Sequence, residues 1–129
     1  MIKVVAAIIE KDGKILYCKR GAGGNCPFLW EFPGGKIEEG ETPFEAIKRE
    51  IFEELSAEIE PAEIFCEYPF SYPEKEIYFY FIKAKLLSEK IMPTFHSETK
   101  WLSPEEAENL EFCPADVFAA EKLKGEYKK

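Results

Sequence analysis

The residues with the clearest chemical potential are three glutamates, Glu50, Glu53 and Glu54. Their spacing of i, i+3 and i+4 places the three carboxylates on one face of a helix. Because neighbouring carboxylates repel one another, a divalent cation between them would stabilise the arrangement. Carboxylate oxygens suit Mg²⁺ or Mn²⁺, and such ions commonly bridge protein carboxylates to phosphates. The alternative interpretation is an acidic helix face that is simply solvated.

Two neighbouring features would shape this site. Arg49 can reach Glu45 or Glu53 at four-residue spacing, so its guanidinium could hold a carboxylate in a fixed orientation. Gly34 and Gly35 follow a short aromatic segment and a proline. We expect the strand to stop there and the backbone to take unusual φ values. Without side chains, this loop could approach the cation and offer the Gly34 carbonyl oxygen as a ligand.

The glutamates lie in the best-defined helix of the sequence, from Thr42 to Leu55. Apolar residues recur in it every three or four positions. Thr42 is the expected N-cap, Pro43 the first helical residue and Glu45 the partner of Thr42 in a capping box. The sequence therefore predicts that this helix begins at a fixed residue, so that its carboxylates have a fixed position.

Strands and turns account for most of the remaining chain. The pattern predicts a hairpin of residues 3–10 and 15–20 closed by a turn at 11–14, a flexible loop at 21–25, a short strand at 28–32, two long antiparallel strands at 59–72 and 76–87, a strand at 99–102, a capped helix start at 103–106 and a closing helix at 114–123. We expect residues 125–129 to fray. This order of elements is typical of an α/β (α+β) protein in which helices flank a sheet.

Composition restricts the possible partners. The 129 residues are 46% hydrophobic and carry a formal net charge of −8, which fits one globular domain over residues 1–129 and disfavours binding to nucleic acid or to an anionic membrane. Neither a membrane span nor a signal peptide is recognisable, so we expect a cytoplasmic protein. Because the four cysteines are widely spaced, we interpret them as reduced thiols, with Cys18 and Cys66 packed in the core.

A longer pattern favours the metal site over the solvated helix face. Gly35, Glu41, Arg49, Glu50, Ile51, Glu53, Glu54 and Ala57 match the Nudix box, GX5EX7REUXEEXGU, in which U is a bulky apolar residue. The chain thus resembles the Nudix hydrolase superfamily. It departs from the pattern at Ser56, which replaces the last glycine; we expect serine to be tolerated if its φ stays negative.

The resemblance extends beyond the box to the MutT-type branch, which hydrolyses nucleoside triphosphates. Residues 29–38 resemble that branch, and Pro114-Ala115-Asp116 is similar to the segment in which it reads the base. Members that prefer cytosine nucleotides resemble this chain in having aspartate there, and a carboxylate can accept the N4 amino group of cytosine. Asp116 could instead cap the last helix. Arg20 resembles a substrate-binding arginine, with a surface ion pair as the alternative.

Other candidate residues are less distinctive. Glu98 and His96 resemble a segment in which relatives supply a metal ligand or base, although polar loop residues are often only solvated. Four aromatic residues at alternating strand positions, Phe70, Tyr72, Tyr78 and Tyr80, could stack on a base, but most should belong to the core or the sheet surface.

The resemblance implies a Nudix-like α/β/α sandwich with a central mixed sheet. It also implies Mg²⁺-dependent hydrolysis of a (deoxy)nucleoside triphosphate, whether ordinary, oxidised or otherwise modified, to monophosphate and pyrophosphate, with Mn²⁺ as the alternative cation. Glu50, Glu53, Glu54 and the Gly34 carbonyl would bind metal; Glu53, Glu50, Arg49 and Glu98 would serve catalysis; and Arg20, Gly35 and Asp116 would bind the substrate, in a monomer or homodimer. The alternatives are hydrolysis of nucleotide sugars or dinucleoside polyphosphates, and a non-catalytic nucleotide sensor.

Overall fold

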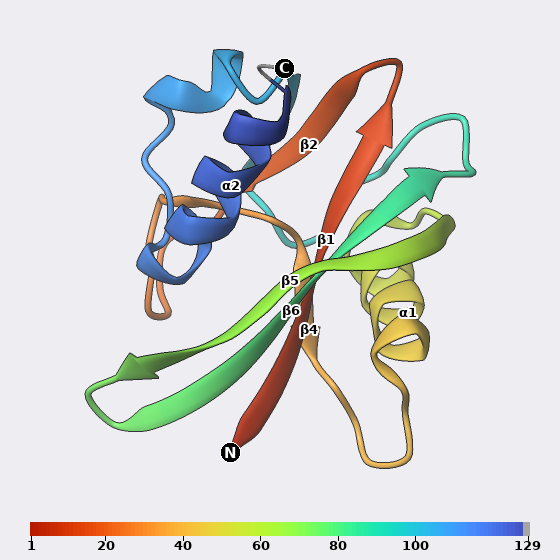
Figure 1. The fold of residues 1–129 in the computed structure, drawn as a ribbon. Helices are drawn as coiled ribbons and strands as arrows, with labels where there is room; N and C mark the ends of the chain where they lie inside the picture. Colours follow the sequence, from red (N-terminus) through yellow and green to blue (C-terminus); the bar gives the residue numbers. More distant parts are fainter. Residues whose placement is uncertain (128–129) are drawn as a thin grey trace.

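The computed structural model describes residues 1–127, in which one mixed sheet is flanked by two α-helices (Figure 1). In chain order the elements are β1 (Ile2–Lys11), β2 (Lys14–Lys19), β3 (Trp30–Glu31), β4 (Gly34–Lys36), α1 (Pro43–Leu55), β5 (Ile59–Tyr72), β6 (Lys75–Leu86), β7 (Glu98–Leu102), the 3-10 turns η1 (Glu106–Asn109) and η2 (Pro114–Asp116), and α2 (Val117–Tyr127). The predicted α/β/α arrangement around a mixed sheet is confirmed.

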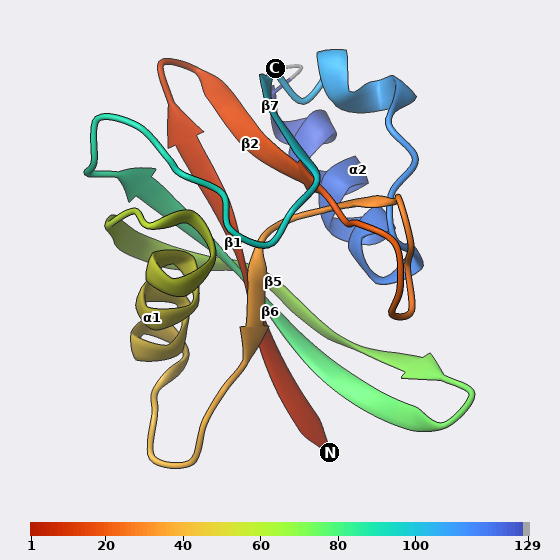
Figure 2. The same cartoon turned by 180° about the vertical axis from the view of Figure 1, so that it is seen from behind.

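The sheet has the strand order β3-β2-β1-β6-β5, with β4 also paired to β1 and β7 to β2. β1 and β6 run parallel, whereas the other strand pairs are antiparallel. Figure 2, from behind, shows β7 beside β2. The β1–β2 hairpin turns at Asp12 and Gly13, which both have positive φ (52° and 78°), as the predicted two-residue turn requires.

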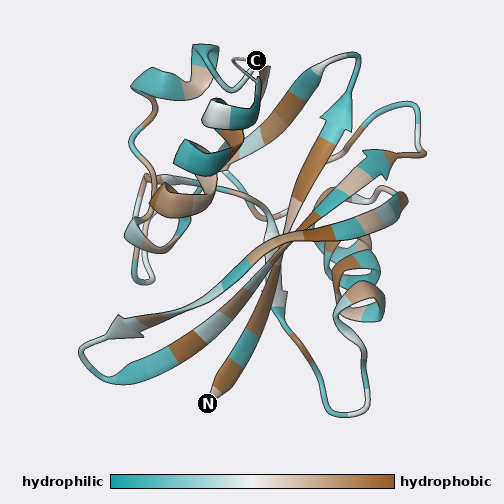
Figure 3. Ribbon diagram, in the orientation of Figure 1, coloured by the Kyte–Doolittle hydropathy of each residue, from teal (hydrophilic) through white to brown (hydrophobic). Residues whose placement is uncertain are grey.

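Alternation along β1 divides the core into two layers. Val5, Ala7 and Ile9 pack in the same cluster as the buried face of α1, which consists of Ala46, Ile47, Ile51 and Leu55. Ala6 and Ile8 pack in a second cluster with Ala119 and Leu123 of α2. Figure 3 shows apolar and polar residues interspersed along β1 and along both helices. The sheet is therefore buried on both faces, and α1 is anchored by its apolar stripe.

The N-terminus of α1 is fixed by its predicted cap. The Thr42 side chain accepts a hydrogen bond from the Glu45 amide, and the Glu45 carboxylate accepts one from the Thr42 amide. Pro43 occupies the first helical turn. The predicted capping box is confirmed, and it defines the start of the helix that carries the three glutamates.

The short strand predicted at 28–32 spans only Trp30–Glu31 as β3 and ends before Pro33 as expected, but a new strand begins directly after that proline. Gly34, Gly35 and Lys36 form β4, which pairs antiparallel with Val4–Ala6 of β1. The expected unusual φ values are wrong, because within residues 1–127 the glycines with positive φ are at positions 13, 23, 24 and 40. The close pairing to β1 makes this segment extended rather than a turn.

The chain ends in a longer helix than expected. Residues 114–116 form the 3-10 turn η2, and α2 follows as far as Tyr127, whose hydroxyl group donates a hydrogen bond to Glu10. The expected fraying is therefore wrong for residues 125–127, and residues 128–129 lie outside the described part of the chain. No helix within residues 1–127 is both long and apolar enough to cross a membrane.

Candidate active site

The two glycines of β4 lie where the neighbouring atoms leave no room for a Cβ. A Cβ at Gly34 would lie 1.9 Å from the Val5 carbonyl oxygen, and a Cβ at Gly35 would lie 2.5 Å from the Glu50 carboxyl carbon. The missing side chains therefore let β4 pack against β1 on one side and against the acidic face of α1 on the other. Close approach of a backbone without side chains was expected here; the groups that it approaches are the Val5 carbonyl oxygen and the Glu50 carboxylate, and the Gly34 carbonyl oxygen stays a predicted metal ligand.

Arg49 joins the carboxylates to the loop that precedes α1. Its Nε and Nη2 donate to the two oxygens of Glu41 at 2.7 and 2.9 Å. Its Nη1 donates to Glu50 at 3.0 Å and to Glu53 at 3.2 Å, and Nη2 also donates to the Lys36 carbonyl oxygen. The hydrogen bonds from Arg49 hold the pKa of Glu41 down at about 2. Of the two expected partners of Arg49, Glu53 is contacted, whereas Glu45 is used in the helix cap.

Glu54 is the unusual carboxylate of the group. Its Oε1 is buried without a hydrogen-bond partner in the described residues. Burial, followed by the charges of Glu50 and Glu31, raises the pKa of Glu54 to about 8, while the Gly34 amide and Arg20 act in the opposite direction. The side chain is therefore held in an environment that penalises its negative charge, and a cation would relieve that penalty.

The donor set fits a hard divalent cation. The Glu50 side chain is 14% exposed and the Glu53 side chain 56% exposed, and both belong to the same helix as Glu54, whose Oε1 has no partner among residues 1–127. Within residues 1–127, no group of three His, Cys, Asp or Glu side chains is already arranged as a coordination sphere. Arg49 bonds to Glu50 and Glu53 instead. Metal binding would therefore require these two carboxylates to turn from Arg49.

Glu98 lies on a different element. It is at the start of β7, paired with Lys19 of β2, and its carboxylate faces Lys100 at 3.9 Å with 47% of the side chain exposed. Among the described residues its recorded polar contacts do not include the glutamates of α1. The structure thus groups Glu50, Glu53 and Glu54 but does not bring Glu98 into contact with them.

A cavity of about 170 Å³ lies next to the β4 glycines. Its lining combines the glycines with the predicted substrate residues Arg20 and Asp116, and it also includes Glu31, Asn25, Cys26, Cys113 and Tyr72. Of the four aromatic candidates, Tyr72 lines this cavity. The cavity therefore extends from the β4 glycines, of which Gly35 packs against Glu50 of α1, to the segment at Asp116.

Asp116 belongs to the lining of this cavity. It is 5% exposed, and its Oδ2 accepts a hydrogen bond from the Phe32 amide at 2.9 Å. Burial raises the pKa of Asp116 well above its usual value, partly opposed by that amide. The Asp116 carboxylate accepts its hydrogen bond from Phe32, which lies 84 residues away between β3 and β4, rather than from an amide of the helix that follows, so the N-cap alternative loses support.

Sequence reasoning missed the role of Glu31. One of its oxygens contacts Arg20 Nη1 at 3.2 Å and the other contacts His96 Nε2 at 2.9 Å. The Arg20 side chain is 26% exposed and the Glu31 side chain 15% exposed, so their ion pair is partly buried, in contrast to the surface ion pair considered from sequence. The available signal was the position of Glu31 inside the segment that resembles the MutT-type branch.

Ser56 and two of the thiols also differ from expectation. Ser56 adopts the left-handed conformation (φ 51°, ψ 39°) as C-cap of α1, so the expected negative φ is wrong and serine takes the geometry of the usual glycine. Cys18 is buried as expected, whereas Cys66 is half-buried. Cys26 and Cys113 are distant in sequence but line the same cavity as free thiols.

This combination of fold and acidic helix face is that of a Nudix hydrolase, and the chain belongs to the NUDIX domain family, which it matches over residues 1–123. It is 38% identical to a CTP pyrophosphohydrolase of Escherichia coli (strain K12), covering 91% of this chain and 87% of the relative. It is 35% identical to an 8-oxo-dGTP diphosphatase of Haemophilus influenzae, covering 98% and 93%.

Solved structures agree with this family. The E. coli ORF135 protein superimposes with a TM-score of 0.81 at 36% identity, covering 94% of this chain and 86% of that protein. A MutT protein from Methanosarcina mazei Go1 superimposes with a TM-score of 0.84 at 26% identity, covering 99% and 96%.

Proposed function

We propose that this Nudix hydrolase cleaves a nucleoside or deoxynucleoside triphosphate to the monophosphate and pyrophosphate, with Mg²⁺ or Mn²⁺ as cofactor and a preference for cytosine. The observation that carries the proposal is a single cavity that runs from the β4 glycines beside Glu50 to the buried carboxyl of Asp116. A triphosphate can lie at the first end while its base reaches the second.

The acidic end would bind the phosphates through metal. Glu50, Glu53 and Glu54 would hold the cation, and charge neutralisation and orientation of the attacking water are the chemistry that it would supply. Arg49 would hold α1 to the preceding loop through Glu41 and the Lys36 carbonyl oxygen while Glu50 and Glu53 turn to the cation. The missing Cβ of Gly35 leaves room for the Glu50 carboxylate beside β4, where the substrate phosphates would lie.

The other end would read the base. Asp116 Oδ2 is already bonded to the Phe32 amide, so Oδ1 is the atom left for a ligand. Oδ1 can accept a hydrogen bond from the N4 amino group of cytosine, which uracil lacks. The E. coli relative named a CTP pyrophosphohydrolase supports the same preference.

The test is a comparison of CTP, dCTP, UTP, GTP, dGTP and 8-oxo-dGTP with purified protein and Mg²⁺, with products resolved by ion-exchange chromatography. We expect the highest kcat/KM for a cytosine nucleotide and about a tenfold or larger loss of that preference in Asp116→Asn. Faster turnover of 8-oxo-dGTP than of every cytosine nucleotide would reject cytosine preference. Turnover of nucleotide sugars or dinucleoside polyphosphates alone would replace the triphosphate assignment.

A further inference from the structure

His96, Glu31 and Arg20 form a continuous chain of polar contacts that ends at the cavity. His96 Nε2 lies 2.9 Å from Glu31 Oε2, and Arg20 Nη1 lies 3.2 Å from Glu31 Oε1, so each carboxylate oxygen holds one partner. The His96 side chain is fully buried, and exposure increases through Glu31 at 15% to Arg20 at 26%. This series of polar contacts thus leads from the buried His96 to Arg20 in the cavity lining.

Three strands hold the His96, Glu31 and Arg20 side chains in place. Glu31 is on β3 and His96 is just before β7, and both strands pair with β2, which ends immediately before Arg20. The Arg20 amide donates to the Leu29 carbonyl oxygen, and the Ser97 amide donates to the Lys19 carbonyl oxygen, both at 2.9 Å. Because the backbone is fixed on both sides, the three side chains meet without ordering a flexible loop.

The guanidinium of Arg20 is held but not fully used. Nη1 bonds to Glu31, and the Phe95 ring lies 5.7 Å from the guanidinium carbon. Its Nε is buried with no hydrogen-bond partner among residues 1–127. Arg20 also lines the cavity that Asp116 closes at the other end. A buried donor of this kind needs an acceptor, and an incoming ligand can supply one.

The ring of His96 suits a positioning role. A carboxylate is an acceptor, so the ring must carry its proton on Nε2, where it meets Glu31. Its Nδ1 has no hydrogen-bond partner in the described part of the chain, so the ring makes its hydrogen bond to Glu31 alone and otherwise packs edge-on against Phe95. In this series of polar contacts, His96 therefore acts on Arg20 only through Glu31.

We propose that His96 and Glu31 are positioning residues that orient the Arg20 guanidinium towards the base, where it donates to a carbonyl oxygen or ring nitrogen of a pyrimidine opposite Asp116. This inference rests on the proposed function. It adds a specificity device outside the helix glutamates, in which a histidine that touches no substrate fixes the arginine that does.

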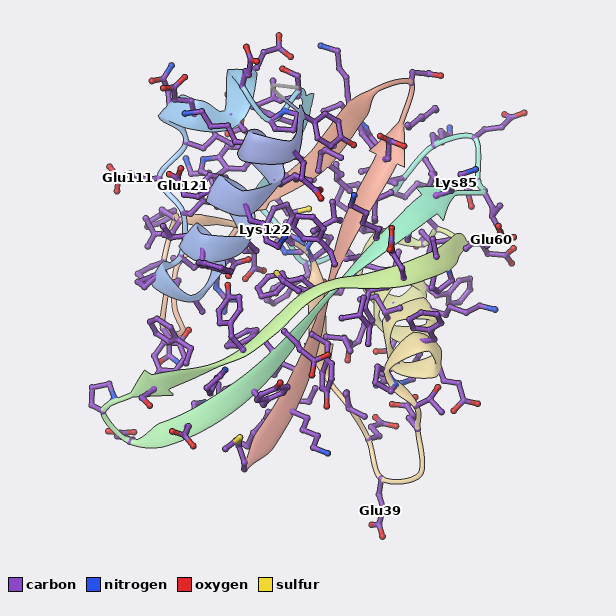
Figure 4. The ribbon with its side chains drawn as sticks, in the orientation of Figure 1. Glu39, Glu60, Lys85, Glu111, Glu121 and Lys122 are labelled. Atoms are coloured by element: carbon purple, nitrogen blue, oxygen red, sulfur yellow. The ribbon has the colours of Figure 1, made fainter. Side chains whose placement is uncertain are left out.

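The experiment compares His96→Leu, His96→Gln and Glu31→Gln with the wild-type enzyme. Glutamine at position 96 can place an amide donor near the position of the histidine Nε2, whereas leucine fills similar space without a donor. Glu111→Gln is the matched control for Glu31→Gln, because Glu111 is an exposed glutamate that projects outwards in Figure 4. Circular dichroism and thermal melting establish that each variant is folded.

Two kinetic substrates separate base contacts from phosphate contacts. For CTP we expect His96→Leu to raise KM by about 10- to 100-fold with kcat within about threefold, by analogy with other outer-shell positioning residues. His96→Gln should recover most of that loss. For ribose 5-triphosphate, which has no base, all variants should remain within about threefold of wild type. An equal loss on both substrates would place Arg20 on the phosphates and overturn the proposal.

A second measurement does not depend on turnover. In ¹⁵N NMR spectra, the Arg20 Nε–H signal, assigned by its disappearance in Arg20→Lys, should exchange slowly with water in wild type and at least tenfold faster in His96→Leu. Unchanged exchange would overturn the positioning role even in a fully active variant. Absence of triphosphate turnover by wild type would instead reject the proposed function, and the NMR result would still decide whether His96 holds Arg20.

Discussion

Glu54→Gln should make the metal-free protein more stable at alkaline pH while removing its activity. Glu54 is buried beside Glu50 and Glu31, and its pKa is raised to about 8 from 4.5. Stability associated with the protonated carboxyl is therefore complete below pH 4.5 and is lost as the pH rises through about 8. Glutamine has nearly the same shape but never acquires the charge, so this loss should disappear.

The size of the effect follows from the pKa change. One pKa unit corresponds to about 1.4 kcal/mol, so a pKa of about 8 in place of 4.5 makes the wild type lose on the order of 3 to 5 kcal/mol relative to Glu54→Gln between pH 5 and pH 9. Part of that loss should be reversed by Mg²⁺, because a ligand that binds only the folded state stabilises it.

Urea unfolding in EDTA at pH 5, 7 and 9 measures this difference. Glu121→Gln, an exposed change on α2 (Figure 4), is the control and should follow the wild type at every pH. Repeating the series in 5 mM Mg²⁺ should raise the stability of the wild type more than that of Glu54→Gln. Parallel pH curves for wild type and Glu54→Gln would refute the idea that this carboxyl is ionised at a cost in the folded protein.

Three further changes test the packing of the site. Gly35→Ala should leave unfolding free energy within about 1 kcal/mol but reduce turnover at least tenfold, because the new Cβ meets the movable Glu50 carboxylate at 2.5 Å. Gly34→Ala should destabilise the fold by at least about 3 kcal/mol, since its Cβ would meet the Val5 carbonyl oxygen at 1.9 Å; equal stability of the two alanine variants in urea would contradict this difference. Ser56→Gly should raise stability by about 0.5–1 kcal/mol, or about 2–5 °C in Tm, by removing a left-handed serine, whereas Ser56→Ala should give no gain by calorimetry.

Local signals in the sequence predicted α1 and the β1–β2 hairpin well. Thr42, Pro43 and Glu45 act on neighbouring backbone groups, so their spacing alone defines the start of the helix. Asp12 and Gly13 likewise supply the positive φ values of a two-residue turn. The spacing of the helix glutamates then follows, because a helix of known start fixes which face each carboxylate occupies.

Features that depend on contacts between distant residues were harder to predict from the sequence. Glu31 and His96 are 65 residues apart and meet because β3 and β7 both pair with β2, a pairing that local periodicity does not encode. The role of Gly35 depends on the distance between β4 and Glu50, so the pattern identified the residue and not the group that it approaches. The left-handed Ser56 could have been anticipated, since the family pattern has glycine at that position.

The central claim is that the cavity and the acidic face of α1 together hydrolyse a nucleoside triphosphate between its α and β phosphates. The most direct measurement is product analysis after incubation of CTP with Mg²⁺ and either wild type or Glu53→Gln, a variant that removes an exposed carboxylate without a core contact. We predict CMP and pyrophosphate in equal amounts from wild type and at least a hundredfold slower release from folded Glu53→Gln. Formation of CDP and phosphate, or near-normal turnover by Glu53→Gln, would contradict the account.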